Sequence, residues 1–214
     1  MNVRQTRATM PEKEVSIIAA SEMHRLFIAV PLPAALQNKA ADAMDRLRQV
    51  QSYKKWVHPE DLHLTLTFIG DVPPASIPAI ETELEKVAAR SNPFPLRLHG
   101  AGTFGLPHSP RVLWAGLDGG MEQLRRLQAD VEGQMAALGY PPEKRPYSPH
   151  ITLARQYTGD APALEEAPAA LFRPDDADGS ALAWIADRIV LYRSHLGRTP
   201  MYEPVRTVVF HAGG

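Results

Sequence analysis

The same short pattern, His-aliphatic-Thr-aliphatic, occurs twice in this chain, at residues 63–66 and 150–153. The two copies lie 150 − 63 = 87 residues apart. If each copy is a strand, its His and Thr share one face and its aliphatic residues share the other, because successive side chains of a strand point to opposite faces. The aliphatic face would pack into a core and the polar face would line a cleft. The pattern therefore predicts two strands that build two halves of one polar site.

The segments around the two motifs carry alternating strand and helix patterns. Apolar residues at helical spacing predict helices over residues 34–50, 77–90 and 121–138. Gly139 should end the last of these helices, as glycine commonly does. Besides the two motif strands, apolar runs bounded by turn residues predict strands over residues 26–30, 96–104, 112–117, 183–192 and 205–210. Residues 158–180 are expected to be mainly surface loop, with a short helix considered near 163–171.

The element order predicts an α+β fold in which each motif belongs to one of two duplicated halves. Antiparallel sheets would face a central cleft, with the helices on the outside and a pseudo-two-fold axis between the halves. The length of 214 residues suits a single two-lobed domain, expected over residues 23–214. Residues 1–22 show little periodicity before residue 15 and are expected to form a loosely attached extension, with an ordinary first helix or strand as the alternative. Met23 is a second candidate for the start of the chain.

The absence of cysteine restricts the chemistry of the chain. It excludes disulfides, thiolate metal sites and thiol nucleophiles, so catalysis would have to use imidazoles, carboxylates or hydroxyls. The 23 Lys and Arg residues nearly balance the 24 Asp and Glu residues, so a polybasic surface for long nucleic acid is not expected. No apolar run approaches the roughly 20 residues of a membrane span, and the N-terminus lacks a hydrophobic signal core. These features predict a soluble, cytoplasmic protein.

The two motifs contain groups that are suited to acid–base chemistry on a phosphate. An unperturbed imidazole has a pKa of about 6.5, so one His can accept a proton while the other donates one near pH 7. The Thr hydroxyls can donate hydrogen bonds to anionic oxygens without adding charge. Around a cyclic phosphodiester, one His could activate water while the other protonates the departing ribose oxygen. Such a reaction requires neither a metal nor a covalent intermediate.

Segments with a matching order and spacing surround both motifs. These segments are residues 25–30, 62–68 with Gly70, 102–104, 111–114, 149–155, and 191–194 before Tyr202. In these segments the chain resembles the 2H phosphoesterase superfamily and, within it, the bacterial and archaeal RNA 2′,3′-cyclic phosphodiesterases, also called 2′-5′ RNA ligase-like proteins. The resemblance extends from about residue 24 to the C-terminus.

The resemblance implies a role for each polar residue of the motifs. By position, His63 is the implied proton donor to the leaving ribose O3′, and His150 is the implied proton acceptor from water, which leaves a terminal 2′-phosphate. Thr65 and Thr152 are implied to hold the non-bridging phosphate oxygens. The implied partner is an RNA 3′ end that carries a 2′,3′-cyclic phosphate, for instance on a tRNA fragment, and no cofactor is required. Joining RNA through a 2′-5′ bond resembles a cyclic-phosphate transesterification run backwards, and we rank it below hydrolysis.

Three further residues are candidates for substrate binding. Arg111 flanks a strand and could neutralise phosphate at the rim of the cleft, with a solvated surface position as the alternative. Phe104 and Tyr147 could stack on a terminal base, although an aromatic residue in a strand also suits a core.

Strand alternation indicates which neighbours of the motifs stand outside the chemistry. Arg155 follows His150 by five residues and should face away from it unless a bulge intervenes. Thr67 has no counterpart in the second motif, where Ala154 stands, and is interpreted as structural.

No metal site is expected from the histidine spacing. His58 and His63 have Asp61 between them, but in a strand their odd spacing would put them on opposite faces. Two alternative functions remain. One is a phosphodiesterase for a small cyclic nucleotide or a 2′-5′-linked oligonucleotide, and the other is a non-catalytic RNA-end binding module. A monomer is expected, because a single chain would supply both halves of the cleft.

Overall fold

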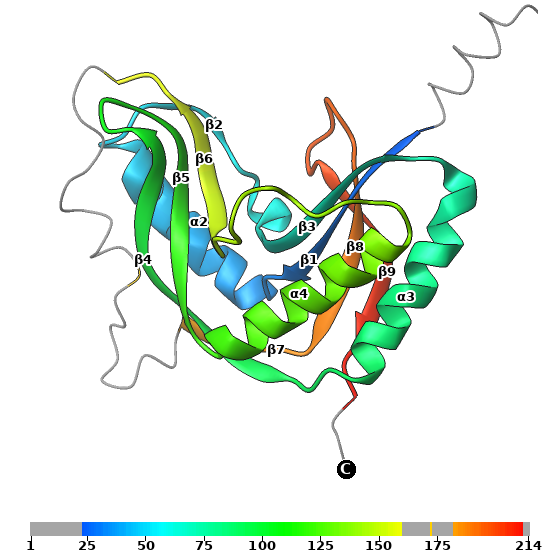
Figure 1. The fold of residues 1–214 in the computed structure, drawn as a ribbon. Coiled ribbons are helices and arrows are strands. Elements are labelled where there is room, and N and C mark those ends of the chain that lie inside the picture. The colour runs from blue at the N-terminus through cyan, green and yellow to red at the C-terminus, as the bar shows by residue number, and fades with distance from the viewer. Residues whose placement is uncertain (1–22, 160–171, 173–181, 212–214) are drawn as a thin grey trace, which may run out of the picture.

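The computed structural model describes residues 23–159, 172 and 182–211 (Figure 1). The extension expected over residues 1–22 and the short helix considered near 163–171 lie outside the described residues. No helix in the described part of the chain is long and apolar enough to cross a membrane.

The described residues form a single antiparallel sheet with helices packed against it. The strands are β1 (His24–Pro31), β2 (Tyr53–Trp56), β3 (His63–Val72), β4 (Phe94–Leu106), β5 (Ser109–Gly119), β6 (Ile151–Tyr157), β7 (Ala183–Ala186), β8 (Arg188–Ser194) and β9 (Tyr202–Val209). The helices are α2 (Ala34–Arg48), α3 (Ile77–Ala89) and α4 (Met121–Ala137), with short 3₁₀ turns η1 (Pro59–Asp61) and η2 (Pro74–Ser76). The sheet order is β7-β4-β5-β6-β3-β1-β8-β9, and β2 pairs with β6.

The sheet consists of two equivalent halves. One half is β7-β4-β5-β6 and the other is β3-β1-β8-β9, and Leu64 opposite Ile151 is the residue pair that joins them. The unit β1-α2-β3 is repeated as β5-α4-β6, because in both units a helix connects two neighbouring antiparallel strands. The second strand of each unit carries a His-aliphatic-Thr-aliphatic motif. This arrangement confirms the predicted duplicated α+β fold.

The helices lie outside the sheet and hold its two halves together. In Figure 1, α2 lies behind β4, β5 and β6, whereas α3 and α4 lie against the half that contains β3 and β9. Leu36, Ala40, Met44 and Leu47 of α2 are all buried, as their helical spacing predicts. Helix α4 ends before Gly139, which has a φ of 92°. Residues with a side chain rarely adopt this backbone angle, whereas glycine adopts it readily.

Two features of the sheet differ from the sequence prediction. The sequence does not predict β2, a short strand with two lysines. The strand predicted over residues 183–192 is broken at Asp187 into β7 and β8, which belong to different halves of the sheet. The apolar pattern hides this break because Ala186 and Ile189, on either side of it, are both buried.

Candidate active site

The first motif contains a β-bulge. Two consecutive residues of β1 lie opposite Thr65 and Thr67, so that Leu66 is an extra residue in β3. An extra residue reverses the alternation of faces for the residues that follow it. Thr67 is accordingly buried, with only 5% of its surface exposed, although it would share a face with Thr65 in an unbroken strand.

The second motif contains a bulge at the same position. Two consecutive residues of β5 lie opposite Thr152 and Ala154, so that Leu153 is an extra residue in β6. The bulge turns Arg155 toward the cavity, where its guanidinium lies 3.5 Å from the Thr152 hydroxyl. The expectation that Arg155 faces away from His150 was therefore wrong, because it assumed an unbroken strand.

Phe68 occupies the position in the first motif that Arg155 occupies in the second. It is 55% exposed and lines the same cavity. Phe68 was not among the predicted site residues, because in a strand without the bulge it belongs to the buried aliphatic face. An alignment of the two motifs pairs Phe68 with Arg155. The bulges, which the sequence does not reveal, are what turn both side chains toward the cavity.

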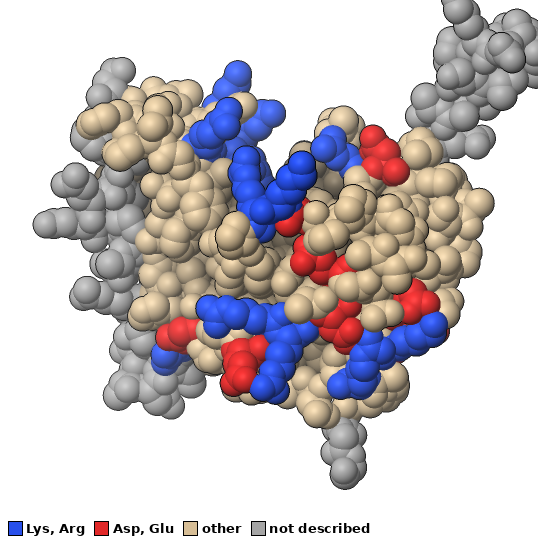
Figure 2. Space-filling view, in the orientation of Figure 1, with Lys and Arg blue, Asp and Glu red and all other residues tan. Residues whose placement is uncertain are grey.

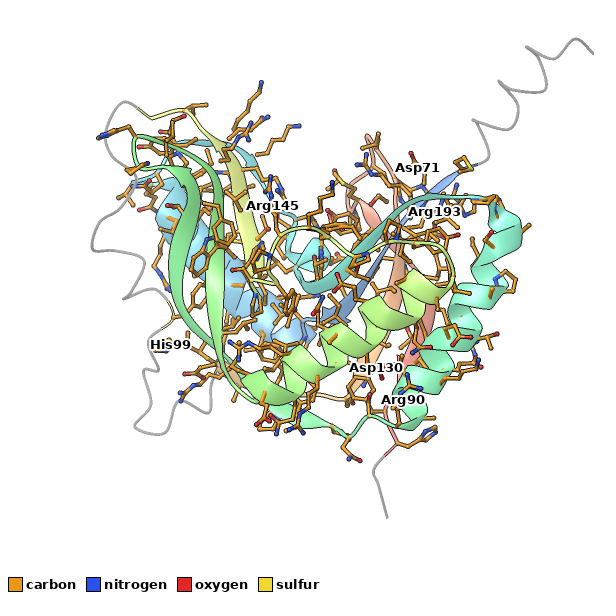
Figure 3. The ribbon with its side chains drawn as sticks, in the orientation of Figure 1. Asp71, Arg90, His99, Asp130, Arg145 and Arg193 are labelled. Atoms are coloured by element: carbon orange, nitrogen blue, oxygen red, sulfur yellow. The ribbon has the colours of Figure 1, made fainter. Side chains whose placement is uncertain are left out.

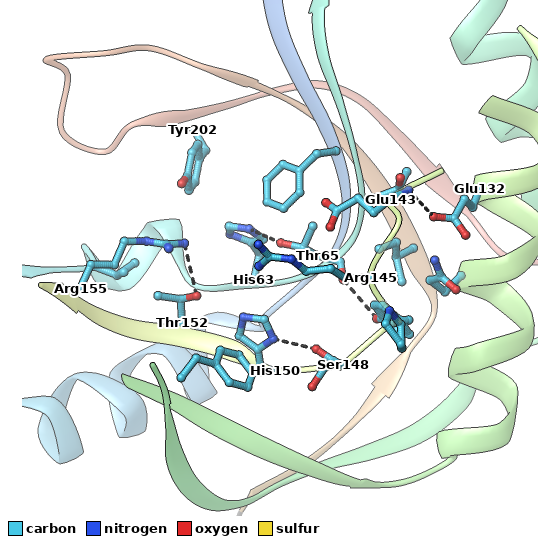
Figure 4. Close-up of a pocket in the computed structure, with 18 of the residues that line it drawn as sticks. His63, Thr65, Glu132, Glu143, Arg145, Ser148, His150, Thr152, Arg155 and Tyr202 are labelled. Atoms are coloured by element: carbon cyan, nitrogen blue, oxygen red, sulfur yellow. Dashed lines mark hydrogen bonds between the residues drawn. The ribbon is translucent and has the colours of Figure 1, made fainter. Parts of the chain in front are cut away.

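The two motifs line one cavity of about 720 Å³. It lies in the hollow between the halves of the sheet, and lysine and arginine side chains gather on both sides of that hollow (Figure 2). The structure brings most of the predicted site residues to this cavity (Figure 4): His63, Thr65, Phe104, Tyr147, His150 and Thr152. Its volume is in the range of small-molecule sites, so it can hold a nucleotide-sized ligand.

His63 is fixed by hydrogen bonds on both ring nitrogens. Its Nδ1 lies 2.7 Å from the carbonyl oxygen of Asp61, and its Nε2 lies 3.0 Å from the Thr65 hydroxyl. A carbonyl oxygen only accepts, so Nδ1 donates and carries the hydrogen in the neutral ring. The lone pair therefore lies on Nε2, beside the hydroxyl that shares its motif.

His150 repeats this arrangement. Its Nδ1 lies 2.7 Å from the carbonyl oxygen of Ser148, which, like Asp61, stands two residues before its histidine. The same donation fixes the same tautomer and leaves Nε2 as the nitrogen that can exchange a proton. The two imidazoles are thus prepared identically by the backbone.

Aromatic rings surround both histidines. The His63 ring packs against Phe27 at 4.8 Å and edge-to-face against Tyr202 at 5.0 Å between ring centroids. The His150 ring packs edge-to-face against Phe104 at 4.9 Å. These contacts hold the rings in place.

Burial lowers the pKa of both imidazoles. It brings the pKa of His63 to about 4, although the hydrogen bond to the Asp61 carbonyl and the Asp61 charge act in the opposite direction. Burial also lowers the pKa of His150, and the positive charge of Arg155 adds to this effect. Both histidines are therefore neutral at pH 7 in the empty cavity.

Tyr147 connects the two motifs. Its hydroxyl donates to the carbonyl oxygen of Thr65 at 3.1 Å, which ties the segment before His150 to β3. Burial raises the pKa of Tyr147, so the phenol keeps its proton and its donor role. Stacking of a base on Tyr147 or on Phe104 remains a prediction.

Arg111 is exposed and does not belong to the residues that line the cavity. Its neighbour Val112 lies opposite Arg155 in the sheet. Because adjacent side chains of a strand alternate between faces, Arg111 points away from the face that Arg155 shares. The structure thus brings Arg155, and not Arg111, to the motifs.

Arg145 is a second cavity residue that the sequence analysis missed. It lies in the irregular segment between α4 and β6, and it points toward the cavity (Figures 3 and 4). The backbone N–H of Glu143 donates to the Glu132 carboxylate at 3.3 Å, which ties this segment to α4. In contrast, the labelled pair Arg90 and Asp130 lies on the outside, where it joins α3 to α4.

His58 lies in the short irregular segment between β2 and η1 and not in a strand. It precedes η1, and its Nδ1 accepts the backbone N–H of Glu60 at 3.4 Å. The strand argument used for the pair His58 and His63 therefore had a wrong premise. Within residues 23–159, 172 and 182–211, no group of three or more His, Asp or Glu side chains is arranged to hold a metal ion.

Comparison with known proteins gives relatives that share most of this chain. The chain is 38% identical over 185 residues to an RNA 2′,3′-cyclic phosphodiesterase of Geobacillus stearothermophilus, an alignment that covers 84% of this chain and 55% of that protein. It is 31% identical over 179 residues to an RNA 2′,3′-cyclic phosphodiesterase of Bacillus subtilis (strain 168), which covers 84% of this chain and 92% of that protein. The chain thus spans little more than half of the first relative and nearly all of the second.

Solved structures share the fold. The protein TT0787 of Thermus thermophilus matches with a TM-score of 0.72 and 30% identity over 89% of this chain and 100% of that one. E. coli LigT in complex with 3′-AMP matches with a TM-score of 0.72 and 26% identity over 88% of this chain and 99% of that one. The model of the 2′-5′ RNA ligase superfamily matches residues 33–198, which include both motifs. The chain therefore belongs to the 2′-5′ RNA ligase superfamily.

Proposed function

We propose that this protein hydrolyses 2′,3′-cyclic phosphate ends of RNA to 2′-phosphates, with two histidines as acid and base. The observation that carries the proposal is the duplicated preparation of the two imidazoles. In each motif a backbone carbonyl accepts the Nδ1 hydrogen at 2.7 Å, and a Thr stands two residues further along the cavity. The names of the relatives support the same chemistry.

The proposed reaction is a single displacement at phosphorus. Nε2 of His150 takes a proton from water, and the water oxygen forms a bond to phosphorus. The bond from phosphorus to O3′ breaks, and O3′ takes a proton from Nε2 of His63. The product carries a 3′-hydroxyl and a 2′-phosphate, and the two histidines exchange protonation states. They must then re-equilibrate with solvent before the next turnover.

The other cavity residues support binding of such a substrate. The hydroxyls of Thr65 and Thr152 can donate to the non-bridging oxygens, where negative charge accumulates in the transition state. The Arg155 guanidinium, 3.5 Å from the Thr152 hydroxyl, adds a positive charge beside that position. The exposed ring of Phe68 provides a flat surface suited to a terminal base.

Binding of the anionic substrate is needed to keep His63, the proposed acid, protonated. His63 has a pKa of about 4 in the empty cavity, yet it must hold a proton to serve as donor. A cyclic phosphodiester carries one negative charge, and charges attract more strongly where water is excluded. Bound phosphate should therefore raise the pKa of the buried His63.

This effect predicts different pH optima for the two kinetic parameters. The profile of kcat/KM reflects the free protein, so its optimum should lie in the acidic range set by the lowered pKa values of the two histidines. The profile of kcat reflects the complex, so its optimum should lie at higher pH. Initial rates between pH 4 and 9 at varied substrate concentrations would measure both. If the pH optima of kcat and kcat/KM coincided, the proposal that bound substrate raises the pKa of His63 would be contradicted.

The proposed activity is tested with an RNA oligomer that ends in a 2′,3′-cyclic phosphate. We expect an RNA 2′-phosphate as the only product, formed at the same rate with and without EDTA, since imidazoles, hydroxyls and a guanidinium can supply every step. A 3′-phosphate product would reverse the assigned leaving group. Binding without turnover would instead identify a non-catalytic RNA-end binding module.

Ligation through a 2′-5′ bond is proposed as a minor reaction of the same cyclic phosphate. An RNA hydroxyl would then take the place of water at the base, and the same acid and base would act. Incubating the same oligomer with an acceptor RNA would detect the joined product.

A further inference from the structure

The two histidines are prepared identically at Nδ1, yet the proposed reaction gives them opposite tasks. Some neighbouring group must therefore make them unequal. The carbonyl that accepts the Nδ1 hydrogen comes from Asp61 in the first motif and from Ser148 in the second. The side chain of this residue, two positions before the histidine, is a carboxylate in the first copy and a neutral hydroxyl in the second.

The Asp61 side chain is buried and held by the backbone of a distant strand. It is 6% exposed, and its carboxylate accepts the backbone N–H of Met201 at 2.8 and 3.0 Å and that of Tyr202 at 2.9 Å. These contacts dock the beginning of β9 on η1. The ring of Tyr202 then packs edge-to-face on His63 at 5.0 Å. Asp61 thus acts on His63 twice, through its carbonyl at Nδ1 and through Tyr202 at the face of the ring.

The charges around His63 differ from those around His150. The titratable or charged groups that face His63 are Asp61 from η1, His150 and Arg155 from the second motif, Tyr192 from β8 and Tyr202 from β9. Within the described residues, Asp61 is the negative charge among them, and it raises the pKa of His63. The charge that acts on His150 is the positive one of Arg155. Burial lowers the pKa of both imidazoles and Arg155 lowers it at both, so Asp61 is the charge that favours a protonated ring at His63 and has no equivalent at His150.

We propose that Asp61 is the positioning residue that breaks the symmetry of the site, so that His63 and not His150 holds the proton when an anionic substrate is bound. This assignment rests on the proposed two-histidine reaction. The carboxylate accepts the backbone N–H groups of Met201 and Tyr202, so we place its action at His63 and not at the substrate. It acts through His63, whose ring it orients and whose charged form it favours.

The first test is the pH dependence of kcat for Asp61→Asn. This variant keeps the shape of the side chain and removes its charge. If Asp61 favours the charged form of His63, the alkaline limb of the profile should move down by about one pH unit. Above that limb kcat should fall by about tenfold, while the acidic limb, which belongs to His150, and KM should change little. A purely structural role would lower kcat at every pH without moving the limb.

Asp71→Asn is the matched control. Asp71 lies on the same strand as His63, is exposed and is shown at the surface in Figure 3. This variant removes the same charge without changing the contacts of η1 and β9. Its alkaline limb should coincide with that of the unchanged protein, and an equal shift in both variants would overturn the assignment.

The second test uses the unchanged protein and does not depend on the folding of a variant. Histidine side-chain resonances are followed by NMR against pH, with and without inorganic phosphate as the bound anion. We expect His63 to retain its proton to higher pH than His150 when phosphate is bound. The opposite order would overturn the assignment. Failure of the proposed function would instead appear as an absence of turnover with the RNA oligomer, whatever order of protonation the NMR titration gives.

Discussion

Replacing His150 with alanine should lower kcat on an RNA 2′,3′-cyclic phosphate by roughly 10²–10⁴-fold, and replacing His63 should do the same. Each change removes a group that moves a proton in the transition state. The two variants should differ in their pH profiles, since His150→Ala loses the acidic limb and His63→Ala loses the alkaline limb. Steady-state rates between pH 4 and 9 would measure this. The kcat of the double variant should be only slightly lower than that of either single variant, because the acid and the base act in the same step.

His99→Ala is the control for these variants. His99 lies on β4, is exposed, and stands far from the cavity in Figure 3. It should keep the rate of the unchanged protein. If His63→Ala and His150→Ala both kept that rate as well, the acid–base assignment would be wrong. Circular dichroism of each variant would show whether loss of the partly buried His63 ring has disturbed the fold.

We expect Thr65→Val and Thr152→Val each to lower kcat by roughly 10²-fold. Valine has the shape of threonine but lacks the hydroxyl that can donate to a non-bridging oxygen. The loss should appear in kcat and in kcat/KM alike, because the charge on these oxygens grows in the transition state. Thr65→Val should also alter the free protein, since the Thr65 hydroxyl lies 3.0 Å from Nε2 of His63.

Thr207→Val provides the comparison for the two motif threonines. Thr207 is an exposed threonine on β9, so this variant makes the same chemical change in a strand without touching the cavity. Its kcat should remain that of the unchanged protein. If the motif variants had the same kcat as Thr207→Val, the two hydroxyls would stabilise the strands and would not bind the phosphate.

The sequence predicts the parts of this fold that depend on local patterns. The three helices begin where their apolar spacing places them, and both motifs lie where strand alternation puts His and Thr on the cavity side. The break at Asp187 could not be predicted, because β7 and β8 pair with strands that are distant in sequence.

The errors at Phe68 and Arg155 have one cause. Leu66 and Leu153 are ordinary aliphatic residues, and nothing in their identity indicates that each is an extra residue opposite a neighbouring strand. The bulges bring Phe68 and Arg155 to the cavity, and the register of Arg155 with β5 leaves Arg111 outside. A bulge is a property of a strand pair, so a reading of one strand at a time cannot find it.

The order of strands in the sheet has a consequence for how the chain folds. The half that contains β1 and β3 is completed only by β8 and β9, at the other end of the described chain. The half that contains β6 takes β2 from before the first motif and β7 from after the second. Neither half can therefore be completed by one continuous segment of the chain. Such long-range pairings are typical of slowly folding proteins. The duplication in space is not a duplication of independently folding segments.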